Sequence, residues 1–290
     1  MAILLDGKKT ASELNETTRK RILKLKQCGI VPGLAVVIVG EDQASQRYVR
    51  NKHKLALKLG MNSVIKEVPA SITEAQLLAL ITELNQDTTI QAILVQDPLP
   101  KHINEQRIMQ SISSTKDVDG FTAVNVGQLY LNLTGNYPVA CTPKGGIMTL
   151  LEKYDIFLRG KKAVVIGRSA IVGKPMAALL VNAGASVSIL HRYTTEIAEY
   201  TRDADLIISA TGVLRLLGAE AVKPGAVIVD VGQNLDETGH LVGDVDFNAV
   251  KDKVAAITPP VPGGVGGPMT IATLMQQTVD LTEWGLANGK

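Results

Sequence analysis

The sequence predicts a two-domain α/β protein with parallel sheets. Short apolar runs alternate with segments of helical spacing, which is typical of strand–helix–strand units. The 290-residue chain is 46% hydrophobic but only 3% aromatic, so its interiors must be aliphatic, as in strands that are buried on both faces. This length fits two domains of ordinary size.

Charge and cysteine content exclude several functional classes. The formal net charge is +2 without a long block of one sign, which argues against a nucleic-acid surface. No apolar run approaches the roughly 18 residues of a membrane span, and charge comes too early for a signal peptide. Cys28 and Cys141 lack a CxxC or CxxH neighbour, which indicates two reduced thiols. We therefore expect a cytoplasmic protein without nucleic-acid or membrane partners.

The first domain is predicted over residues 1–140 and is completed by a returning C-terminal helix, residues 269–290. Its helices are expected at residues 10–27 and 44–59, and from Thr73, where Thr73 and Gln76 form a capping box, to about residue 84. Its strands are expected at residues 34–39, 64–68 and 90–96. Residues 116–143, rich in Asn, Gly and Pro, are predicted to be irregular and to mark the boundary.

Residues 141–268 are predicted to form a doubly wound second domain. A helical segment at 145–154 comes before strands expected at 163–166, 186–190, 206–209, 227–231 and 254–257. A loop dense in Pro and Gly, residues 259–268, precedes the last helix. This order is that of a Rossmann-like sheet, which binds ligands at the carboxyl ends of its strands.

The turn after the first of these strands has the features of a phosphate site. Gly167, Arg168, Ser169 and Gly173 lie between an apolar strand and an Ala/Leu-rich helix. Glycines let the backbone approach a phosphate closely, and the helix N-terminus favours negative charge. The spacing departs from G-x-G-x-x-G, so an ordinary tight turn is the alternative.

The following strand ends indicate which dinucleotide is bound. His191 and Arg192 stand where NAD-binding proteins usually carry an acid for the ribose 2′-OH. Arg192 and Arg168 suit a 2′-phosphate instead, so NADP is favoured over NAD, with a solvated surface charge as the alternative for Arg192. Thr211 and Gly212, and likewise Gly232, are small residues at strand ends that leave room for ribose and nicotinamide, or that only turn the chain.

A second candidate site lies on the predicted helix at residues 44–59. Ser45, Tyr48, Lys52, Leu55 and Leu59 share one helix face by their spacing. Lys52 on that face either extends to water or is a partly desolvated amine available for proton transfer or charge stabilisation. Tyr48, one turn earlier, offers a flat ligand an aromatic face.

Two further segments can supply polar groups to this site. Gln96 ends the third strand, where its amide can orient an ammonium without neutralising it. Asp117 and Asp119 follow in a loop, and a carboxylate that accepts N–H bonds from a heterocycle fits them better than a metal site. No His, Asp or Glu spacing completes a metal site, so none is predicted.

Several stretches together resemble the bifunctional methylenetetrahydrofolate dehydrogenase/methenyltetrahydrofolate cyclohydrolase family. They follow the family's order over both predicted domains, which is more specific than any single motif. They are Val39-Gly40 through Ser45, Tyr48 and Lys52; Val95-Gln96 with Pro98-Leu99-Pro100; Lys116 to Gly120; Cys141-Thr142-Pro143; Gly167 to Pro175; Asp230-Val231-Gly232; Gly243-Asp244-Val245; and Pro262 to Gly266.

This resemblance implies roles for individual residues. Tyr48 would stack on the folate ring, Lys52 would be the central catalytic group, Gln96 would position Lys52, and Asp119 would bind the pterin. Pro262, Gly263 and Gly264 would line the substrate site. The family's reactions are oxidation of 5,10-methylenetetrahydrofolate with NADP and hydrolysis of the methenyl product to 10-formyltetrahydrofolate, in one-carbon metabolism. Homodimers are implied as well.

The chain departs from the family pattern at several positions. Asp97 stands where leucine is usual, and would raise the pKa of Lys52 if its carboxylate pointed inward. Ala140 replaces a proline, Arg192 replaces a frequent serine, and the loop at residues 258–270 has one extra proline and one extra glycine. Three alternatives follow: a dehydrogenase of the same family without the hydrolysis step, a shikimate dehydrogenase type of enzyme, and a non-catalytic nucleotide-binding regulator.

Overall fold

The computed structural model describes residues 2–135, 137–261 and 263–288, and it divides the chain into two compact units. Leu14–Val139 and Leu274–Lys290 form the lysine unit, which contains Lys52. Met1–Glu13 and Ala140–Thr273 form the glycine-turn unit, which contains Gly167. Helices α1 (Gly7–Gln27) and α10 (Pro268–Ala287) each begin in the glycine-turn unit and end in the lysine unit.

This division differs from the predicted one at the N-terminus. The sequence placed residues 1–13 with the first domain, whereas the structure groups them with the glycine-turn unit. The reason is the short strand β1 (Ile3–Leu4), which pairs in parallel with β11 (Ala256–Ile257). Two residues are too few to show a periodic pattern, so only the distant pairing partner defines this strand.

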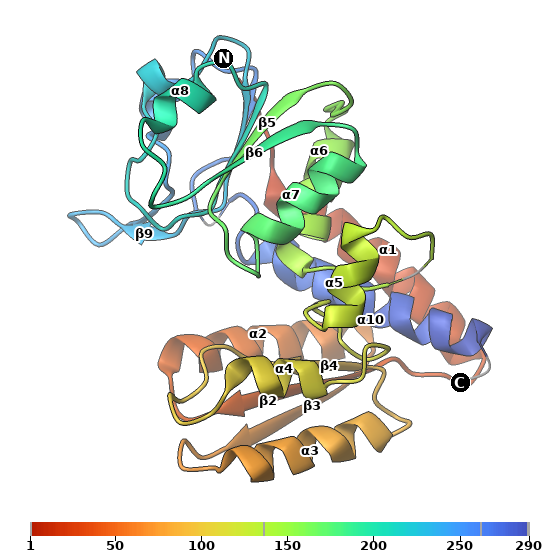
Figure 1. Ribbon diagram of the computed structural model, residues 1–290. Coiled ribbons are helices and arrows are strands. Elements are labelled where there is room, and N and C mark those ends of the chain that lie inside the picture. The colour runs from red at the N-terminus through yellow and green to blue at the C-terminus, as the bar shows by residue number, and fades with distance from the viewer. Residues whose placement is uncertain (1, 136, 262, 289–290) are drawn as a thin grey trace. The chain divides into compact units, whose positions relative to one another are not determined.

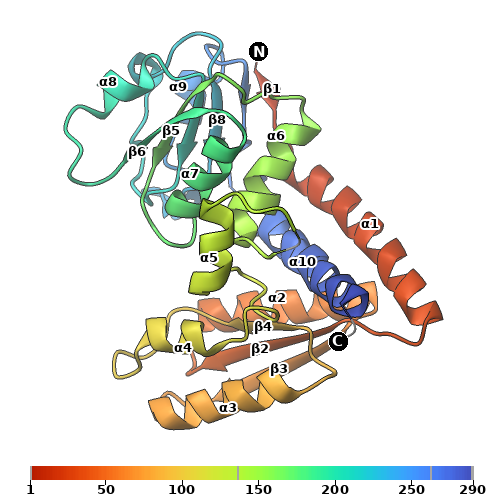
Figure 2. The same cartoon turned by 45° about the vertical axis from the view of Figure 1, so that its right-hand side comes forward.

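The lysine unit is built on a three-stranded parallel sheet in the order β3-β2-β4. Its strands are β2 (Gly33–Val39), β3 (Asn62–Val68) and β4 (Ala92–Val95), and Val36 pairs with Ile65 on one side and Leu94 on the other. Helices α2 (Gln43–Leu59) and α3 (Glu74–Gln86) cover opposite faces of the sheet (Figures 1 and 2). Both faces of β2 are therefore buried, which explains its unbroken apolar sequence.

Capping groups set the ends of these helices. The predicted capping box is confirmed, because Thr73 and Gln76 exchange hydrogen bonds at the start of α3. Gly60 ends α2 with φ of 96°, a left-handed conformation that favours glycine.

The prediction that residues 116–143 are irregular is wrong in part, because α5 (Ala123–Tyr130) lies there, and α4 (Glu105–Ser111) precedes it.

The glycine-turn unit contains a six-stranded parallel sheet in the order β1-β11-β8-β7-β5-β6. The strands not yet given are β5 (Lys162–Ile166), β6 (Ser186–Leu190), β7 (Leu206–Ser209) and β8 (Val227–Asp230). The chain adds β6 on one side of β5 and β7 on the other, so the direction of winding reverses at β5. The doubly wound prediction is confirmed.

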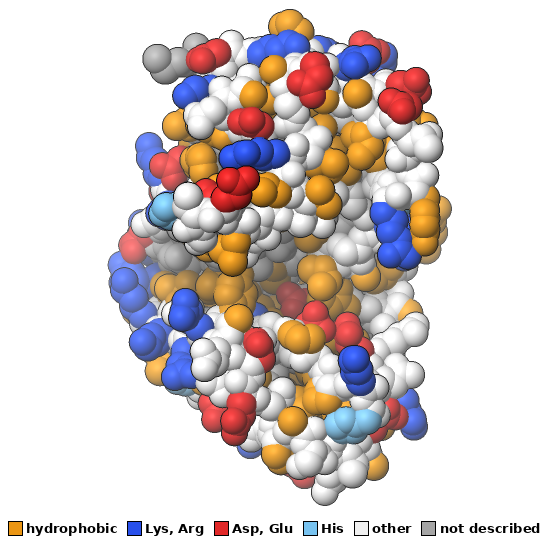
Figure 3. Space-filling view, turned by 90° about the vertical axis from the view of Figure 1, so that its left-hand side faces the viewer, with side chains coloured by type: hydrophobic (Ala, Val, Ile, Leu, Met, Phe, Trp, Pro, Cys, Tyr) orange, Lys and Arg blue, Asp and Glu red, His pale blue; other side chains and the backbone are white. Residues whose placement is uncertain are grey.

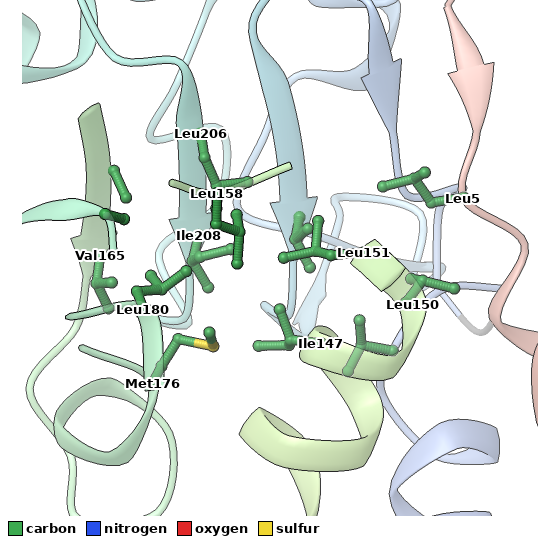
Figure 4. Packing of buried hydrophobic residues seen from close by; sticks show 14 of the residues in the cluster. Leu5, Ile147, Leu150, Leu151, Leu158, Val165, Met176, Leu180, Leu206 and Ile208 are labelled. Carbon is green, nitrogen blue, oxygen red and sulfur yellow. The ribbon is translucent and has the colours of Figure 1, made fainter. Parts of the chain in front are cut away.

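Alternating residues of this sheet enter two separate cores. Ala163 and Val165 of β5 pack with helices α6 (Thr149–Lys153) and α7 (Gly173–Asn182), as Figure 4 shows for Val165, Met176 and Leu180. Val164 and Ile166 enter the opposite core, which includes residues next to or within α8 (Ile197–Thr201), η2 (Ala219–Ala221) and α9 (Phe247–Val250). Turn η1 (Thr142–Met148) precedes α6, and β9 (Asn234–Leu235) and β10 (Leu241–Val242) form a hairpin.

Surface and helix composition agree with the charge pattern of the sequence. Basic and acidic side chains both occur across the face drawn in Figure 3. Among the described residues, no helix has the length and apolar character that crossing a membrane requires.

Candidate active site

Helix α2 positions Lys52 by an N-cap and a buried stripe. The Asp42 carboxylate caps the helix by accepting a hydrogen bond from the Ser45 backbone N–H at 2.8 Å. The buried residues of the helix, at alternating spacings of four and three, are Ser45, Val49, Lys52, Ala56 and Leu59. Lys52 thus belongs to the core-facing stripe, while Tyr48 lies at its edge and is half-buried.

The Lys52 side chain is buried rather than extended to water. Only 5% of the residue is exposed, so the alternative of a solvated ammonium is wrong. Its Nζ donates a hydrogen bond to Gln96 Oε1 at 2.9 Å and lies 4.9 Å from the centre of the Tyr48 ring. The ring face and the amide oxygen both favour a cation at this position. The structure therefore brings together Tyr48, Lys52 and Gln96, as predicted.

Gln96 is held by the strand that precedes it. Its backbone N–H donates to the Val37 carbonyl at 2.8 Å, which extends the pairing of β4 with β2 by one residue. Its side-chain Nε2 donates to the Asp97 carbonyl at 2.7 Å. Since the amide nitrogen is engaged there, the amide oxygen is directed to Lys52, and Gln96 acts as an orienting acceptor.

The Asp97 carboxyl interacts with Glu105 at the start of α4. Burial raises the pKa of Glu105, and the charge of Asp97 and a hydrogen bond with it raise that pKa further. The effect of Asp97 is thus exerted on an acid, whereas its contact with the lysine site is the backbone carbonyl that accepts from Gln96. Any residue at position 97 could accept this hydrogen bond through its backbone carbonyl. The aspartate that replaces leucine there therefore does not change how Gln96 is held.

The two loop carboxylates have different surroundings. Asp117 is 2% exposed and accepts hydrogen bonds from the backbone N–H of Phe121 and Thr122 and from Asn125 Nδ2, so it organises the start of α5. Asp119 is half-buried. A parallel bridge joins Asp117 to Ile93 of β4. The segment from Asp117 to Asp119 therefore runs in the same direction as the segment of β4 that leads to Gln96.

The predicted nucleotide residues all lie at the carboxyl edge of the six-stranded sheet. They belong to the loops after the adjacent strands β6, β5, β7 and β8, at the point where the winding direction reverses. These residues are Gly167, Arg168, Ser169 and Gly173 after β5; His191 and Arg192 after β6; Thr211 and Gly212 after β7; and Gly232 after β8.

The turn after β5 fits a phosphate-binding loop because it excludes side chains. Gly167 has φ of 125°, and a Cβ there would lie 2.5 Å from the Ala210 carbonyl oxygen. A Cβ on Gly173, the first residue of α7, would collide with the Gly167 carbonyl. Ser169 Oγ accepts from the Val172 backbone N–H at 3.0 Å and tightens the turn. Close backbone packing at Gly167 and Gly173 thus shapes this turn before the helix N-terminus.

The two arginines predicted for a 2′-phosphate both lie close to one aromatic ring, that of Tyr193. The guanidinium carbon of Arg168 is 5.5 Å and that of Arg192 is 4.8 Å from the centre of the Tyr193 ring. Arg192 also donates to the Tyr193 hydroxyl at 2.7 Å, and the His191 ring meets Tyr193 edge-on. Tyr193 was not among the predicted site residues, although its position next to Arg192 was a signal for it.

The substrate residues predicted in the Pro/Gly loop are only partly described. Pro262 lies outside the described residues. Gly263 accepts a hydrogen bond from the Gly7 backbone N–H at 3.1 Å, and the Gly264 carbonyl lies where a Cβ on Gly7 would be. The loop is therefore held against the start of α1, within the glycine-turn unit.

Two carboxylates of the glycine-turn unit, the half-buried Asp230 and the fully buried Asp244, were not recognised as site residues. Asp230 and Asp244 hold the loops that carry Thr211 and Gly232. Burial raises the pKa of Asp230 to about 6. Their motifs, Asp230-Val231-Gly232 and Gly243-Asp244-Val245, were noted only as part of the family resemblance, because local sequence does not show which loops a carboxylate joins.

The two sites define an α/β protein that combines a glycine-turn nucleotide fold with a buried lysine held by a glutamine. Comparison with known families also finds two domains in the chain. The model for the tetrahydrofolate dehydrogenase/cyclohydrolase catalytic domain matches residues 5–119, and that for the NAD(P)-binding domain of the same family matches residues 140–285. The chain belongs to the tetrahydrofolate dehydrogenase/cyclohydrolase family.

Full-length relatives agree. The bifunctional protein FolD of Levilactobacillus brevis is 57% identical over 100% of this chain and 99% of its own length, and that of Lactiplantibacillus plantarum is 53% identical over 98% of both. The FolD crystal structure from Campylobacter jejuni has 49% identity and a TM-score of 0.94, covering 98% of this chain and 99% of its own. The Trypanosoma brucei enzyme, complexed with NADP and an inhibitor, has 35% identity and a TM-score of 0.92, covering 98% of both chains.

Proposed function

We propose that the protein oxidises 5,10-methylenetetrahydrofolate with NADP and hydrolyses the resulting 5,10-methenyltetrahydrofolate to 10-formyltetrahydrofolate. Family membership supports both reactions, and one observation supports the assignment of residues. This observation is the buried Lys52, whose Nζ is fixed by Gln96 at 2.9 Å beside the Tyr48 ring. The lysine unit then binds folate, and the glycine-turn unit binds the nucleotide.

In this proposal the lysine unit performs the hydrolysis. The Tyr48 ring stacks on the flat pterin, and Asp119 accepts N–H bonds from its edge. Water adds to the methenyl carbon and loses one proton. The hydroxyl then gives up its remaining proton, the C–N5 bond breaks as N5 takes up a proton, and the formyl group stays on N10. Lys52, held by Gln96, donates a hydrogen bond to the oxygen as negative charge develops on it.

The glycine-turn unit holds NADP. The backbone at Gly167 and Gly173 approaches the pyrophosphate, and Arg168 and Arg192 pair with the 2′-phosphate beside Tyr193. Bound NADP would supply the acceptor for the hydride that leaves the methylene carbon. The residues of this unit bind and orient, and no proton transfer is assigned to them.

We further propose a cytoplasmic homodimer. Supporting the dimer, Leu235 and Leu241 are paired across the β9–β10 hairpin and are 65% and 47% exposed, so together they offer an apolar surface to a second copy. Light scattering should give the mass of a dimer for the wild type. For Leu235→Lys it should show a larger fraction of monomer.

One assay tests the proposed function. The protein is incubated with methylenetetrahydrofolate and either NADP or NAD, and both the reduced nucleotide and the methenyl product are followed by absorbance. We expect faster reduction of NADP and only transient methenyl absorbance. Accumulating methenyltetrahydrofolate would show a dehydrogenase without the hydrolysis step, and reduction of neither nucleotide would overturn the proposal.

A further inference from the structure

The loop after β10 carries a buried carboxylate to which the proposed reactions assign no role. Asp244 is 0% exposed. Its Oδ2 accepts hydrogen bonds from Ser209 Oγ at 2.9 Å and from both the backbone N–H and the hydroxyl of Thr211, at 2.7 and 2.9 Å. Its Oδ1 accepts from Asn234 Nδ2 at 3.0 Å. Asp244 therefore joins the end of β7, the loop after it and the start of the hairpin.

Asp230, the last residue of β8, holds Asp244 in turn. One Asp230 carboxylate oxygen accepts from the backbone N–H of Gly232 at 2.9 Å and of Asp244 at 3.0 Å, and the other accepts from the Val245 backbone N–H at 2.9 Å. We call Asp230 and Asp244 the carboxylate clasp. Its fit is close, because a Cβ on Gly232 would collide with the Asp244 carboxylate, and a Cβ on Gly243 with that of Asp230.

Burying two carboxylates side by side is unfavourable unless donors surround them. Within the described part of the chain, the hydrogen-bond donors to the clasp are backbone N–H groups, hydroxyls and one amide, and none belongs to a Lys or Arg. The raised pKa of Asp230, caused mainly by burial, reflects that cost. A cost of this kind is common where a protein fixes a functional loop.

Some of the hydrogen-bond donors held by the clasp lie at the carboxyl edge of the six-stranded sheet, among the predicted nucleotide residues. Thr211 is bound at two of its atoms, and Gly212 follows it directly with a left-handed φ of 69°. Gly232 is bound through its backbone N–H. We propose that Asp244 is a positioning residue for the nucleotide, which holds the loops after β7 and β8 in the conformation that receives the ribose and nicotinamide. This inference rests on the proposed dehydrogenase activity.

The substitution Asp244→Asn tests the role because it keeps the shape and removes an acceptor. In either orientation the new amide nitrogen faces hydrogen-bond donors, those of Ser209 and Thr211 or that of Asn234, so the variant loses part of the contacts that hold the Thr211 loop. We expect the KM for NADP to rise about tenfold, the effect of losing a hydrogen bond to a charged group. Hydrolysis of methenyltetrahydrofolate uses no nucleotide and should stay within about twofold of the wild type, which a general loss of folding would not permit.

A matched control and a second variant complete the experiment. Asp246→Asn alters a carboxylate two residues away that caps α9 through the Ala249 backbone N–H, and the KM for NADP should not change. Thr211→Val removes the hydroxyl that donates to Asp244 and should raise the KM for NADP about threefold. This variant tests the positioning role if Asp244→Asn does not fold.

The outcomes are distinct. An unchanged KM for NADP in Asp244→Asn, or equal loss of both activities in it and in Thr211→Val, would overturn the positioning role. Failure of the wild type to reduce NADP would instead overturn the proposed function.

Discussion

The two units solve different chemical problems by different means. In the lysine unit, one charged side chain is placed by a helix and oriented by one amide, Gln96. In the glycine-turn unit, the candidate site combines glycines with polar side chains, is spread over four strand ends and is held by the carboxylates of Asp230 and Asp244. Managing charge at one atom needs a single well-oriented group, whereas binding a long anionic cofactor needs many loops without obstructing side chains.

This contrast predicts that the two activities can be separated. Oxidation requires both units, because the nucleotide and the folate must both be bound. Hydrolysis requires only the folate site. Changes in the nucleotide loops of the glycine-turn unit should therefore affect oxidation alone, while changes at Lys52 should affect hydrolysis most.

The largest effect in the glycine-turn unit is expected from Gly173→Ala. The added Cβ would collide with the Gly167 carbonyl, which is backbone and cannot move away cheaply. We expect kcat/KM for NADP to fall about a hundredfold, as displacements of about an ångström in a binding loop often cause. Hydrolysis of methenyltetrahydrofolate, measured on the same preparation, should be retained; equal loss of both activities would contradict the separation.

The next effect concerns stability and its dependence on pH. The pKa of Asp230 is raised from 3.8 to about 6, mainly by burial, so between these pH values the folded protein binds more protons than the unfolded chain. Asp230 therefore lowers the unfolding free energy as pH rises through this window, by up to about 3 kcal/mol, and has no further effect above it.

Asp230→Asn removes this titration. Denaturant unfolding at pH 4, 5, 6 and 7 should show the stability of the variant rising relative to the wild type up to about pH 6 and then staying constant. A difference that does not change with pH would show that Asp230 has an ordinary pKa.

A smaller effect is expected from Tyr193→Phe. The substitution keeps the ring that Arg168 and Arg192 approach and removes the hydroxyl that accepts from Arg192 at 2.7 Å. We expect kcat/KM for NADP to fall about fivefold, because Arg192 loses one exposed hydrogen bond that helps to orient it. NAD has no 2′-phosphate and is the internal control, so an equal fall with both nucleotides would remove Tyr193 from the specificity site.

The sequence predicted the elements whose signals are local. Unbroken apolar runs identified most strands, and Thr73 with Gln76 identified the start of α3. Strand β1 and helix α5 were missed because their causes are distant or atypical. β1 exists through its pairing with β11, and Asp117 fixes the start of α5 by binding the backbone N–H of Thr122, its N-cap.

The same distinction applies to the candidate sites. The spacing of Tyr48 and Lys52 on one helix face was visible in the sequence, and the structure confirms their proximity. Whether Lys52 was buried or solvated depended on Gln96, which is 44 positions away. Asp244 depends likewise on Ser209 and Thr211, so its hydrogen bonds emerged only from the fold.

The most direct test of the account measures both activities in Lys52→Met. Lys54→Met is the matched control, because Lys54 is an exposed lysine on the same helix. We predict that Lys52→Met loses hydrolysis by at least about a hundredfold while keeping measurable NADP-dependent oxidation, and that Lys54→Met keeps both. Full hydrolysis of methenyltetrahydrofolate by Lys52→Met would contradict the account.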